Sequence, residues 1–340
     1  MKINNRRGAE VQRKSLSLRA SMVKNFKYMK HNFSLLLLCF ICLQNQSFAQ
    51  TQPTLAERLG YPKDAKLLII HADDLAVAHS ENQASFNAMK NGSVNSASVM
   101  VPCPWLPEVA AYAKANPNHD LGLHLTLTSE WKHLKWGPVS DCSELTGLVD
   151  SNGYFFDNCA SFASQAKPEA VEAELRAQIE KAKAMGIEPT HLDSHMGCLF
   201  FQSPVLFSIY LKLGREYGIP TMVGRDLLNA LPEPFRQAVT EKDIVIDRIF
   251  GAGPEDFQKG MADYYSNVLQ NLQPGVSLII LHAAYDDAEM QGVSVDHPDW
   301  GAAWRQADYD FFTSETCRKL IKEQGIQLIT WREIGKLLKK

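Results

Sequence analysis

Apolar runs of strand length alternate with amphipathic stretches of helical length along most of this 340-residue chain. The strand-like runs are residues 66–72, 94–101, 121–127, 189–192, 221–223, 244–249, 277–281 and 327–330. The helical stretches between them are residues 82–90, 106–116, 168–185, 204–217, 254–272 and 316–324. Such alternation predicts parallel strands joined by right-handed crossovers. Because no Gly-rich nucleotide loop follows any strand-like run, the pattern favours an α/β fold of the (β/α)-barrel type over an open sheet.

Chain length and charge indicate one ordinary globular domain. A (β/α) barrel occupies about 250 residues, so residues 66–340 can form a single barrel domain. Residues 128–167 are the only sizeable insertion, and we expect them to cover the active face. The formal net charge of −3 comes without a basic stripe, so the sequence gives no reason to expect nucleic acid as a partner.

The first 49 residues have the features of an export signal. A basic stretch that includes Lys27 and Lys30 precedes an uncharged apolar run over residues 33–43, and small residues follow at Ser47 and Ala49. The apolar run is too short to cross about 30 Å of hydrocarbon. We therefore expect cleavage after Ala49, a short leader over residues 50–65, no stable membrane anchor, and a periplasmic or secreted protein.

Loss of residues 1–49 would remove Cys39 and Cys42 from the seven cysteines of the chain. The five that remain are Cys103, Cys142, Cys159, Cys198 and Cys317. Because an exported chain meets an oxidising compartment, a disulfide is expected, and an odd count leaves at least one thiol unpaired. Cys142 and Cys159 flank a Gly-rich polar segment and are the favoured pair. The alternative is that both are independent buried thiols.

Polar residues with metal-binding or acid–base chemistry fall at the ends of several strand-like runs. They are Asp73 and Asp74 after the first run, His124 in the third, His191, Asp193 and His195 at the fourth, and His282 after the seventh. The carboxyl ends of barrel strands converge on one face, where active sites lie. Two imidazoles and one carboxylate can bind a divalent cation and leave coordination positions for water and substrate. The sequence therefore predicts a hydrolytic metal site.

The position of Asp73 and Asp74 in the first strand-like run decides whether both can serve one site. Adjacent residues of an extended strand point in opposite directions. Both carboxylates can reach the same site only where the strand gives way to its loop, with one binding the metal and its neighbour acting as base.

Three motifs make the chain resemble the YdjC-like carbohydrate deacetylases, a group that includes chitooligosaccharide deacetylase. They are residues 67–74 (LLIIHADD), 122–128 (GLHLTLT) and 189–195 (PTHLDSH), and residues 91–100 look like the family's second strand. The resemblance implies an irregular, TIM-barrel-like (β/α) barrel that uses a divalent metal. It further implies that the metal ligands are Asp74, His124 and His195, that Asp73 is the catalytic base and that His282 protonates the leaving amine.

The chain departs from the family pattern beside the expected site. The family commonly continues its third motif with alternating histidines, whereas Met196, Gly197 and Cys198 follow here. Leu75-Ala76 replaces the usual Phe-Gly, and Ala283-Ala284 replaces the usual Pro-Gly. We therefore expect the metal triad to be retained and the substrate pocket to differ from one for chitooligosaccharides.

Further polar and aromatic residues have interpretations of their own. His191 and Asp193 are expected to support and orient His195, or His191 is a satisfied structural residue. His71 is expected to be a polar residue of the barrel interior. Arg305 is expected in a surface ion pair, with support of Asp73 or sugar binding as alternatives. The loop tryptophans serve either sugar stacking or packing; they are Trp105, Trp131, Trp136, Trp300 and Trp304.

The sequence thus predicts a metal-dependent hydrolase that removes acetyl groups from an acetylated oligosaccharide or polysaccharide, with an N-acetyl amino sugar favoured over an O-acetyl ester. The cation is expected to be zinc or magnesium, with manganese also compatible with the ligand set. One alternative is a metal-dependent ester or phosphodiester hydrolase. Another is a carbohydrate-binding protein with a vestigial site, which the retention of both Asp73 and Asp74 disfavours.

Overall fold

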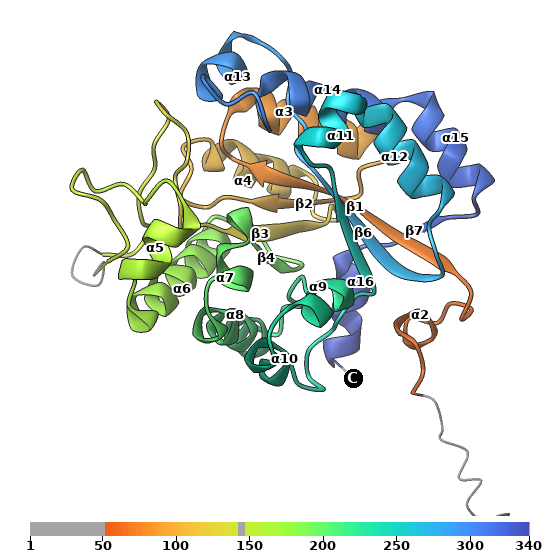
Figure 1. Ribbon diagram of the computed structural model, residues 1–340, viewed down its shortest axis with the longest axis horizontal. Coiled ribbons are helices and arrows are strands. Elements are labelled where there is room, and N and C mark those ends of the chain that lie inside the picture. Colours follow the sequence, from red (N-terminus) through yellow and green to blue (C-terminus); the bar gives the residue numbers. More distant parts are fainter. Residues whose placement is uncertain (1–51, 142–146, 340) are drawn as a thin grey trace, which may run out of the picture. The chain divides into compact units, whose positions relative to one another are not determined.

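The computed structural model describes residues 52–141 and 147–339. The expected export signal (residues 1–49) and Cys142 lie outside these residues. The described chain from Thr54 onward forms one compact unit. The fold is shown in Figure 1.

All strand pairings of the central sheet are parallel. The strands are β1 (Lys66–Leu75), β2 (Ser96–Val99), β3 (Leu121–Leu125), β4 (Leu192–Ser194), β5 (Arg248–Gly251), β6 (Gly275–Leu281) and β7 (Gln327–Leu328). Their order is β4-β3-β2-β1-β6-β5, and β7 pairs with the first half of β1. The parallel sheet with helical crossovers agrees with the sequence prediction.

Isolated backbone bridges span the space between β4 and β5. Leu192 pairs with Thr221, and Gly224 pairs with Ile246. The sequence predicts strands over residues 221–223 and 244–249. Residues 221–224 and 244–246 contribute only single bridges, and the end of the second predicted strand lies in β5. The strands form an irregular barrel in which, among the described residues, only these isolated bridges connect β4 to β5. The predicted TIM-like (β/α) barrel is confirmed in this irregular form.

Helices surround the sheet. The first seven in chain order are α2 (Leu55–Arg58), α3 (His79–Asn91), α4 (Leu106–Ala115), α5 (Cys159–Gln165), α6 (Pro168–Ala184), α7 (Cys198–Phe201) and α8 (Pro204–Tyr217). They are followed by α9 (Arg225–Ala230), α10 (Glu233–Ala238), α11 (Pro254–Lys259), α12 (Met261–Gln270), α13 (Ala288–Val293), α14 (Ala302–Thr313), α15 (Glu315–Glu323) and α16 (Trp331–Gly335). The short 3-10 helices are His195–Gly197 and Lys336–Lys339.

Local sequence explains several helix boundaries. Pro168 and Pro204 begin α6 and α8, where a missing N–H costs nothing. Gly218 ends α8 with φ 66°, a left-handed conformation that glycine adopts without steric cost. The single helix expected over residues 254–272 is two helices, because Gly260, with φ 117°, breaks the chain between α11 and α12.

Strand β1 passes through the centre of the molecule and is buried on both sides. Leu68 and Ile70 belong to the large cluster that packs against the surrounding helices. Leu67 and Ile69 belong to a second cluster with residues of β6 and α16. Burial on both faces explains why the strand reads as a continuous apolar run. Because side chains alternate along a strand, His71 lies on the same face as Leu67 and Ile69.

The described part of the insertion contains α5 and an isolated antiparallel bridge between Val149 and Phe155. In Figure 1 its loops, drawn in yellow to yellow-green, lie on the side toward which the arrowheads of β1 and β2 point. The insertion is thus beside the carboxyl ends of the strands.

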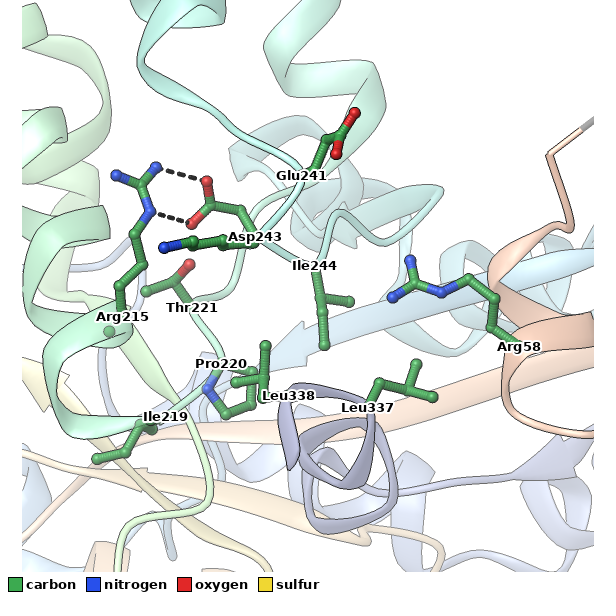
Figure 2. A pocket seen from close by; sticks show the side chains of 13 residues that line it. Arg58, Arg215, Ile219, Pro220, Thr221, Glu241, Asp243, Ile244, Leu337 and Leu338 are labelled. Atoms are coloured by element: carbon green, nitrogen blue, oxygen red, sulfur yellow. Dashed lines mark hydrogen bonds and ion pairs between the residues drawn. The ribbon is translucent and has the colours of Figure 1, made fainter. Parts of the chain in front are cut away.

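A cavity of about 330 Å³ lies at the opposite end of the barrel (Figure 2). Thr221 and Ile244, which begin two of the bridging segments, line it together with Leu337 and Leu338. An ion pair between Arg215 and Asp243 borders it. None of the polar residues expected at the active face lines this cavity, so its size does not mark the site.

One bent helix pair, His195–Phe201 with Pro204–Tyr217, satisfies the length and composition of a membrane span, and no single helix within the described residues does so.

Candidate metal and catalytic site

Asp74, His124 and His195 bring three metal-ligating atoms together at the carboxyl ends of the strands. All three residues are buried, and one ligand atom from each lies within 4.8 Å of the others. Asp74 Oδ1 is 3.3 Å from His124 Nε2 and 3.3 Å from His195 Nδ1. The three residues lie at the ends of β1, β3 and β4. The structure therefore groups the residues that the sequence predicts as ligands.

The hydrogen bonds of the two histidines leave free the nitrogens that face Asp74. His124 Nδ1 lies 2.7 Å from Asp193 Oδ1, and His195 Nε2 lies 2.9 Å from Glu130 Oε2. A carboxylate partner requires an N–H at that nitrogen, so the neutral ring keeps a lone pair on the other one. Asp74 Oδ1 is buried and accepts no hydrogen bond. Three acceptor atoms that converge in this way fit a divalent cation.

The electrostatics of this pocket favour positive charge. Burial opposes a charged ring at His195, but Glu130 and Asp74 outweigh it and raise the pKa of His195 to about 9. Burial likewise opposes ionisation of Asp74, yet Arg305 and the two imidazoles hold its pKa well below the ordinary value. The carboxylate is therefore ionised and available as a ligand near pH 7. A cation that binds here must displace protons from the imidazoles.

An irregularity in β1 brings the neighbouring carboxylates to one site. The register against β2 shifts between Ala72 and Leu75, and Asp74 has φ 66°, in the left-handed region that non-glycine residues rarely adopt. As a result, His124 Nε2 is 3.3 Å from Asp74 Oδ1 and 3.8 Å from Asp73 Oδ2. The expectation that both aspartates serve one site only where the strand becomes irregular agrees with this geometry.

Asp73 is held by one carboxylate oxygen and presents the other. Its Oδ1 lies 2.8 Å from His71 Nε2 and accepts a hydrogen bond from Ser98 Oγ at 3.3 Å. Its Oδ2 faces His124 Nε2 at 3.8 Å, beyond hydrogen-bond distance. Oδ2 is therefore the oxygen that can take a proton from a molecule at the triad.

Asp193 connects His124 to His71. It is the direct partner of His124 in the β3–β4 register, which explains the contact of its Oδ1 with His124 Nδ1. Its Oδ2 lies 2.9 Å from His71 Nε2. The structure thus places Asp193 behind His124, rather than behind His195 as the sequence interpretation had it; the carboxylate behind His195 is Glu130.

His191 has the contacts of a packed core residue. Its ring stacks on Trp331 with centroids 5.1 Å apart, and its Nε2 is buried without a hydrogen bond, 3.7 Å from Asp193 Oδ2. A Cβ atom on Gly122 would lie 2.3 Å from this ring, so the glycine of the second motif makes room for the histidine of the third. Of the two expectations for His191, these contacts fit the structural one.

Arg305 is buried, and the expectation of a surface ion pair is wrong. It lies on the inner face of α14 and is 1% exposed. Its Nη2 donates to Asp74 Oδ2 at 2.8 Å, and its Nη1 contacts Glu81. Its partner is thus Asp74 and not Asp73. Burial raises the pKa of Glu81 well above its ordinary value, whereas Arg305 helps to hold the pKa of Asp74 well below its ordinary value.

His282 follows β6 on the same side of the site. Its Nε2 lies 4.0 Å from Asp74 Oδ2, and its side chain is 19% exposed. Burial lowers the pKa of His282 to about 4, and the charge of Asp74 offsets this only in part. The ring is therefore neutral near pH 7, and the expected role as proton donor requires it to take up a proton first.

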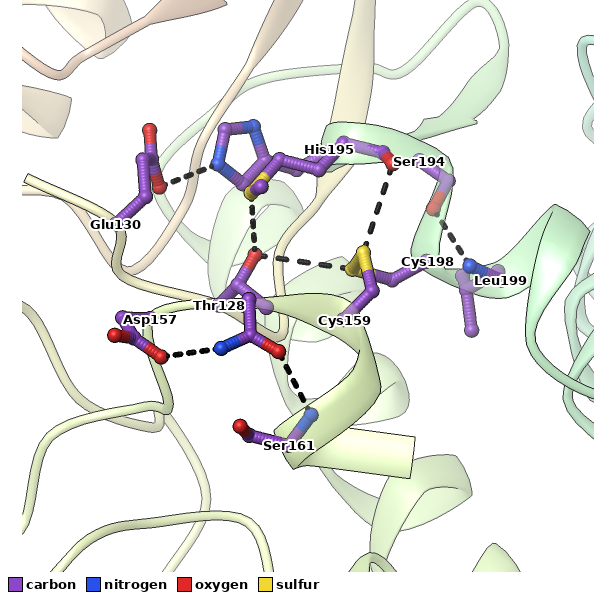
Figure 3. Close-up of a disulfide and its surroundings, with 11 residues drawn as sticks. Thr128, Glu130, Asp157, Cys159, Ser161, Ser194, His195, Cys198 and Leu199 are labelled. Atoms are coloured by element: carbon purple, nitrogen blue, oxygen red, sulfur yellow. Dashed lines mark hydrogen bonds and ion pairs between the residues drawn. A yellow bond between two sulfur atoms is a disulfide. The ribbon is translucent and has the colours of Figure 1, made fainter. Parts of the chain in front are cut away.

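A disulfide joins the insertion to the segment that carries His195 (Figure 3). It links Cys159, at the start of α5, to Cys198, at the start of α7. The favoured pairing of Cys142 with Cys159 is therefore wrong, as is the alternative of an independent thiol at Cys159. The short 3-10 helix over His195–Gly197 leads to Cys198, which lies beside Cys159 although the two cysteines are 39 positions apart in the chain. Cys103 and Cys317 are buried free thiols.

Exposure separates the loop tryptophans into two groups. Trp131, Trp136 and Trp304 are at most 3% exposed and therefore serve packing. Trp105 and Trp300 are 38% and 39% exposed and are the two that can still stack on a ligand.

Two acidic residues of the site, Glu81 and Glu130, are absent from the sequence prediction. Glu81 lies on α3 among buried small residues, Ala84 and Ser85, and an acidic residue on such a face is a signal of a buried partner. Glu130 lies in the loop after β3, where no periodic pattern marks its role.

Comparisons with known proteins agree with the site. The YdjC-like protein family matches residues 67–323. A carbohydrate deacetylase of Thermus thermophilus is 32% identical over 292 residues, covering 84% of this chain and 99% of that protein. A carbohydrate deacetylase of Brevibacillus brevis is 32% identical over 278 residues, covering 79% of this chain and 99% of that protein.

A solved structure has the same fold. It is a protein of Enterococcus faecalis V583 proposed to cleave cellobiose phosphate, with a TM-score of 0.65 and 24% identity, covering 79% of this chain and 99% of that one. The family match spans all three motifs and the strands that bear the clustered residues. The chain therefore belongs to the YdjC-like protein family, and the Thermus and Brevibacillus proteins to which it is similar over most of its length are carbohydrate deacetylases, a class of hydrolase.

Proposed function

We propose that this protein is a carbohydrate deacetylase that uses a divalent cation held by Asp74, His124 and His195. The observation that carries the proposal is the convergence of three buried acceptor atoms, Asp74 Oδ1, His124 Nε2 and His195 Nδ1. The family relatives named carbohydrate deacetylases support the class of reaction and of substrate.

Asp73 is the proposed base. A divalent cation at the triad supplies Lewis acidity toward the acetyl carbonyl oxygen and the attacking water. Asp73 Oδ2 takes a proton from that water, because Oδ1 is already engaged by His71 and Ser98. The water oxygen then bonds to the carbonyl carbon.

The reaction is complete when the bond between the carbonyl carbon and the sugar nitrogen or oxygen breaks and that atom gains a proton. We propose that His282, whose Nε2 lies 4.0 Å from Asp74 Oδ2, relays the proton that Asp73 removed. Acetate and a free amine or hydroxyl are the products.

The substrate is proposed to be an acetylated oligosaccharide or polysaccharide, with an N-acetyl amino sugar favoured. Zinc and magnesium are the favoured cations, and manganese also suits a set of mixed nitrogen and oxygen ligands. Met196, Gly197, Cys198 and Leu199 follow His195 where the family commonly continues with alternating histidines, so specificity for chitooligosaccharides is not proposed.

The decisive experiment compares Asp73→Asn with Asp74→Asn by acetate release from a panel of acetylated glycans. Asp73→Asn should retain the metal and lose turnover, with kcat reduced by about 100-fold or more. Asp74→Asn should lose both metal affinity and activity. Asp64→Asn, an exposed change in the turn before β1, is the matched control and should behave like the wild type.

The alternatives predict other outcomes in the same assay. A carbohydrate-binding protein with a vestigial site would release no acetate from any glycan and would bind sugar equally well after Asp73→Asn. An ester or phosphodiester hydrolase would cleave a nitrophenyl acetate or a bis-nitrophenyl phosphate but no glycan.

We also propose that the protein is exported and acts in the periplasm or outside the cell. The basic, apolar and small-residue succession before Gln50 motivates this, and the Cys159–Cys198 disulfide supports it because such bonds persist in oxidising compartments. Sequencing of the mature amino terminus should begin at Gln50. Recovery of the active protein from the cytoplasm with residues 30–49 intact would overturn it.

A further inference from the structure

His71 occupies a place between two carboxylates that the proposed mechanism uses only indirectly. It is fully buried. Its Nε2 lies 2.8 Å from Asp73 Oδ1 and 2.9 Å from Asp193 Oδ2. Its Nδ1 lies 2.9 Å from Ser96 Oγ, its register partner on β2. Both ring nitrogens are therefore engaged, and the one that faces the site is shared by two acids.

The position of His71 in β1 accounts for these contacts. The interior-facing residues of β1 change from apolar Leu67 and Ile69 to His71 and then Asp73, so the polar part of the interior begins at this ring. A hydrocarbon side chain here would leave Asp193 Oδ2 without its hydrogen-bond donor and Asp73 Oδ1 with that of Ser98 alone, which is costly for buried carboxylates. An N–H at His71 Nε2 can donate to both Asp73 Oδ1 and Asp193 Oδ2.

The contact also fixes which oxygen of Asp73 works. With Oδ1 held by His71 and Ser98, rotation of the carboxylate about its Cβ–Cγ bond would break both contacts. Oδ2 is thereby kept on the side of His124 Nε2, 3.8 Å away. Through Asp193, the same N–H is linked to the hydrogen bond that orients His124.

We propose that His71 is a positioning residue for the deacetylation reaction: its Nε2–H, shared by Asp73 Oδ1 and Asp193 Oδ2, orients the base and ties it to the ligand His124. This inference rests on the proposed function. It assigns a reaction-specific role to a residue that burial alone would class as part of the core.

Two substitutions separate the nitrogen that matters from the one that does not. The side-chain amide of His71→Gln can reach the place of Nε2, whereas that of His71→Asn reaches only the place of Nδ1. With the metal-loaded enzyme, His71→Asn should lower kcat by about 100-fold with KM within about twofold. His71→Gln should recover kcat to within about tenfold of the wild type. The metal content of both variants should match that of the wild type.

Ser96→Ala is the matched control, because it removes the hydrogen bond at Nδ1 and leaves the Nε2 contacts in place. It should keep kcat within about threefold. Equal losses in His71→Asn, His71→Gln and Ser96→Ala would show that the ring is only structural and would overturn the proposal. An unchanged kcat in His71→Asn would also overturn it.

A measurement on the wild type covers the case in which the variants do not fold. In ¹⁵N-histidine-labelled protein, His71 Nε2 should carry a proton that is protected from exchange, and this signal should shift in Asp73→Asn. An unprotonated Nε2 would contradict the proposal. If the wild type releases no acetate from any glycan, the proposed function fails instead, whatever the state of His71.

Discussion

Arg305 donates from Nη2 to Asp74 Oδ2 at 2.8 Å, although the two residues are 231 positions apart in the chain. This hydrogen bond occupies one oxygen of the carboxylate and leaves Oδ1 for the two triad histidines. Arg305 Nε also donates to the carbonyl oxygen of Trp300 at 2.7 Å. With Glu81, the guanidinium therefore has three partners. Because the other two fix its position, it can orient the Asp74 carboxylate.

Arg305→Lys should weaken metal binding without abolishing folding. An ammonium group can contact one of the three partners but cannot bridge them in the plane of a guanidinium. We expect the metal Kd to rise by about 10- to 100-fold, as for other residues that orient metal ligands. Competition with a chelator measures it, and Arg318→Lys on the surface of α15 is the control. An unchanged Kd would mean that Asp74 is oriented by its backbone alone.

Glu130 should tune the metal affinity through His195. Glu130→Gln keeps an acceptor for His195 Nε2 but removes the charge, so we expect a loss of about tenfold in affinity. Glu130→Ala removes both and should cost more, up to about 100-fold. Isothermal titration of the metal-free protein gives both values. The order of the two variants is the test, and an equal loss in both would point to charge as the whole effect.

The disulfide should stabilise the protein in an oxidising solution. Closing a loop between Cys159 and Cys198, which are 39 positions apart, is worth up to about 4 kcal/mol in the chain-entropy account. The double variant Cys159→Ser/Cys198→Ser should therefore unfold at a lower temperature than the wild type. Reductant should lower the Tm of the wild type and leave that of the variant unchanged. A wild-type Tm that is insensitive to reductant would contradict the bond or its effect.

Stability should fall as the pH rises through the titration of His71. Burial opposes its charged form, but Asp193 and Asp73 raise its pKa to about 9, above the ordinary value of 6.5. A raised pKa contributes stability that is fully present below pH 6.5 and is lost as the pH rises through 9. The contribution is on the order of 3 kcal/mol. Urea unfolding of the metal-free protein from pH 6 to 10 should show this decline.

His71→Gln provides the comparison, since its amide does not titrate. The difference in unfolding free energy between wild type and variant should shrink between pH 6.5 and 9. A difference that stays constant across this range would show that His71 does not change its charge there.

The sequence predicted the parts of the site that lie at strand ends. Asp74, His124 and His195 lie within or shortly after apolar runs, and parallel strands bring their carboxyl ends to one face whatever the loops between them do. Arg305 follows a different rule. It lies on α14 with Trp304 and Asp308 on the same buried side. Their spacing indicates a helix face that points inward, and the prediction of a surface ion pair did not take this spacing into account.

Contacts made by the loops were beyond sequence reasoning. Glu130 lies in a segment without periodicity, and its contact with His195 depends on how the insertion folds back. The partner of Cys159 depends on the same fold, because Cys198 is distant in sequence and lies beside α5 only once the barrel has formed. The bridging segments 221–224 and 244–246 are apolar enough for strands, but a barrel this irregular gives them single bridges.

The register shift in β1 sets a limit on any attempt to engineer a more regular barrel. A regular ladder from Ala72 to Leu75 would relieve the left-handed backbone of Asp74 and would gain stability in that strand. It would also turn the Asp74 carboxylate toward the helical shell, because one residue of slip reverses the face of every side chain. A redesign that selects for ideal strand geometry in β1 would therefore produce a more stable protein that lacks one of its proposed metal ligands.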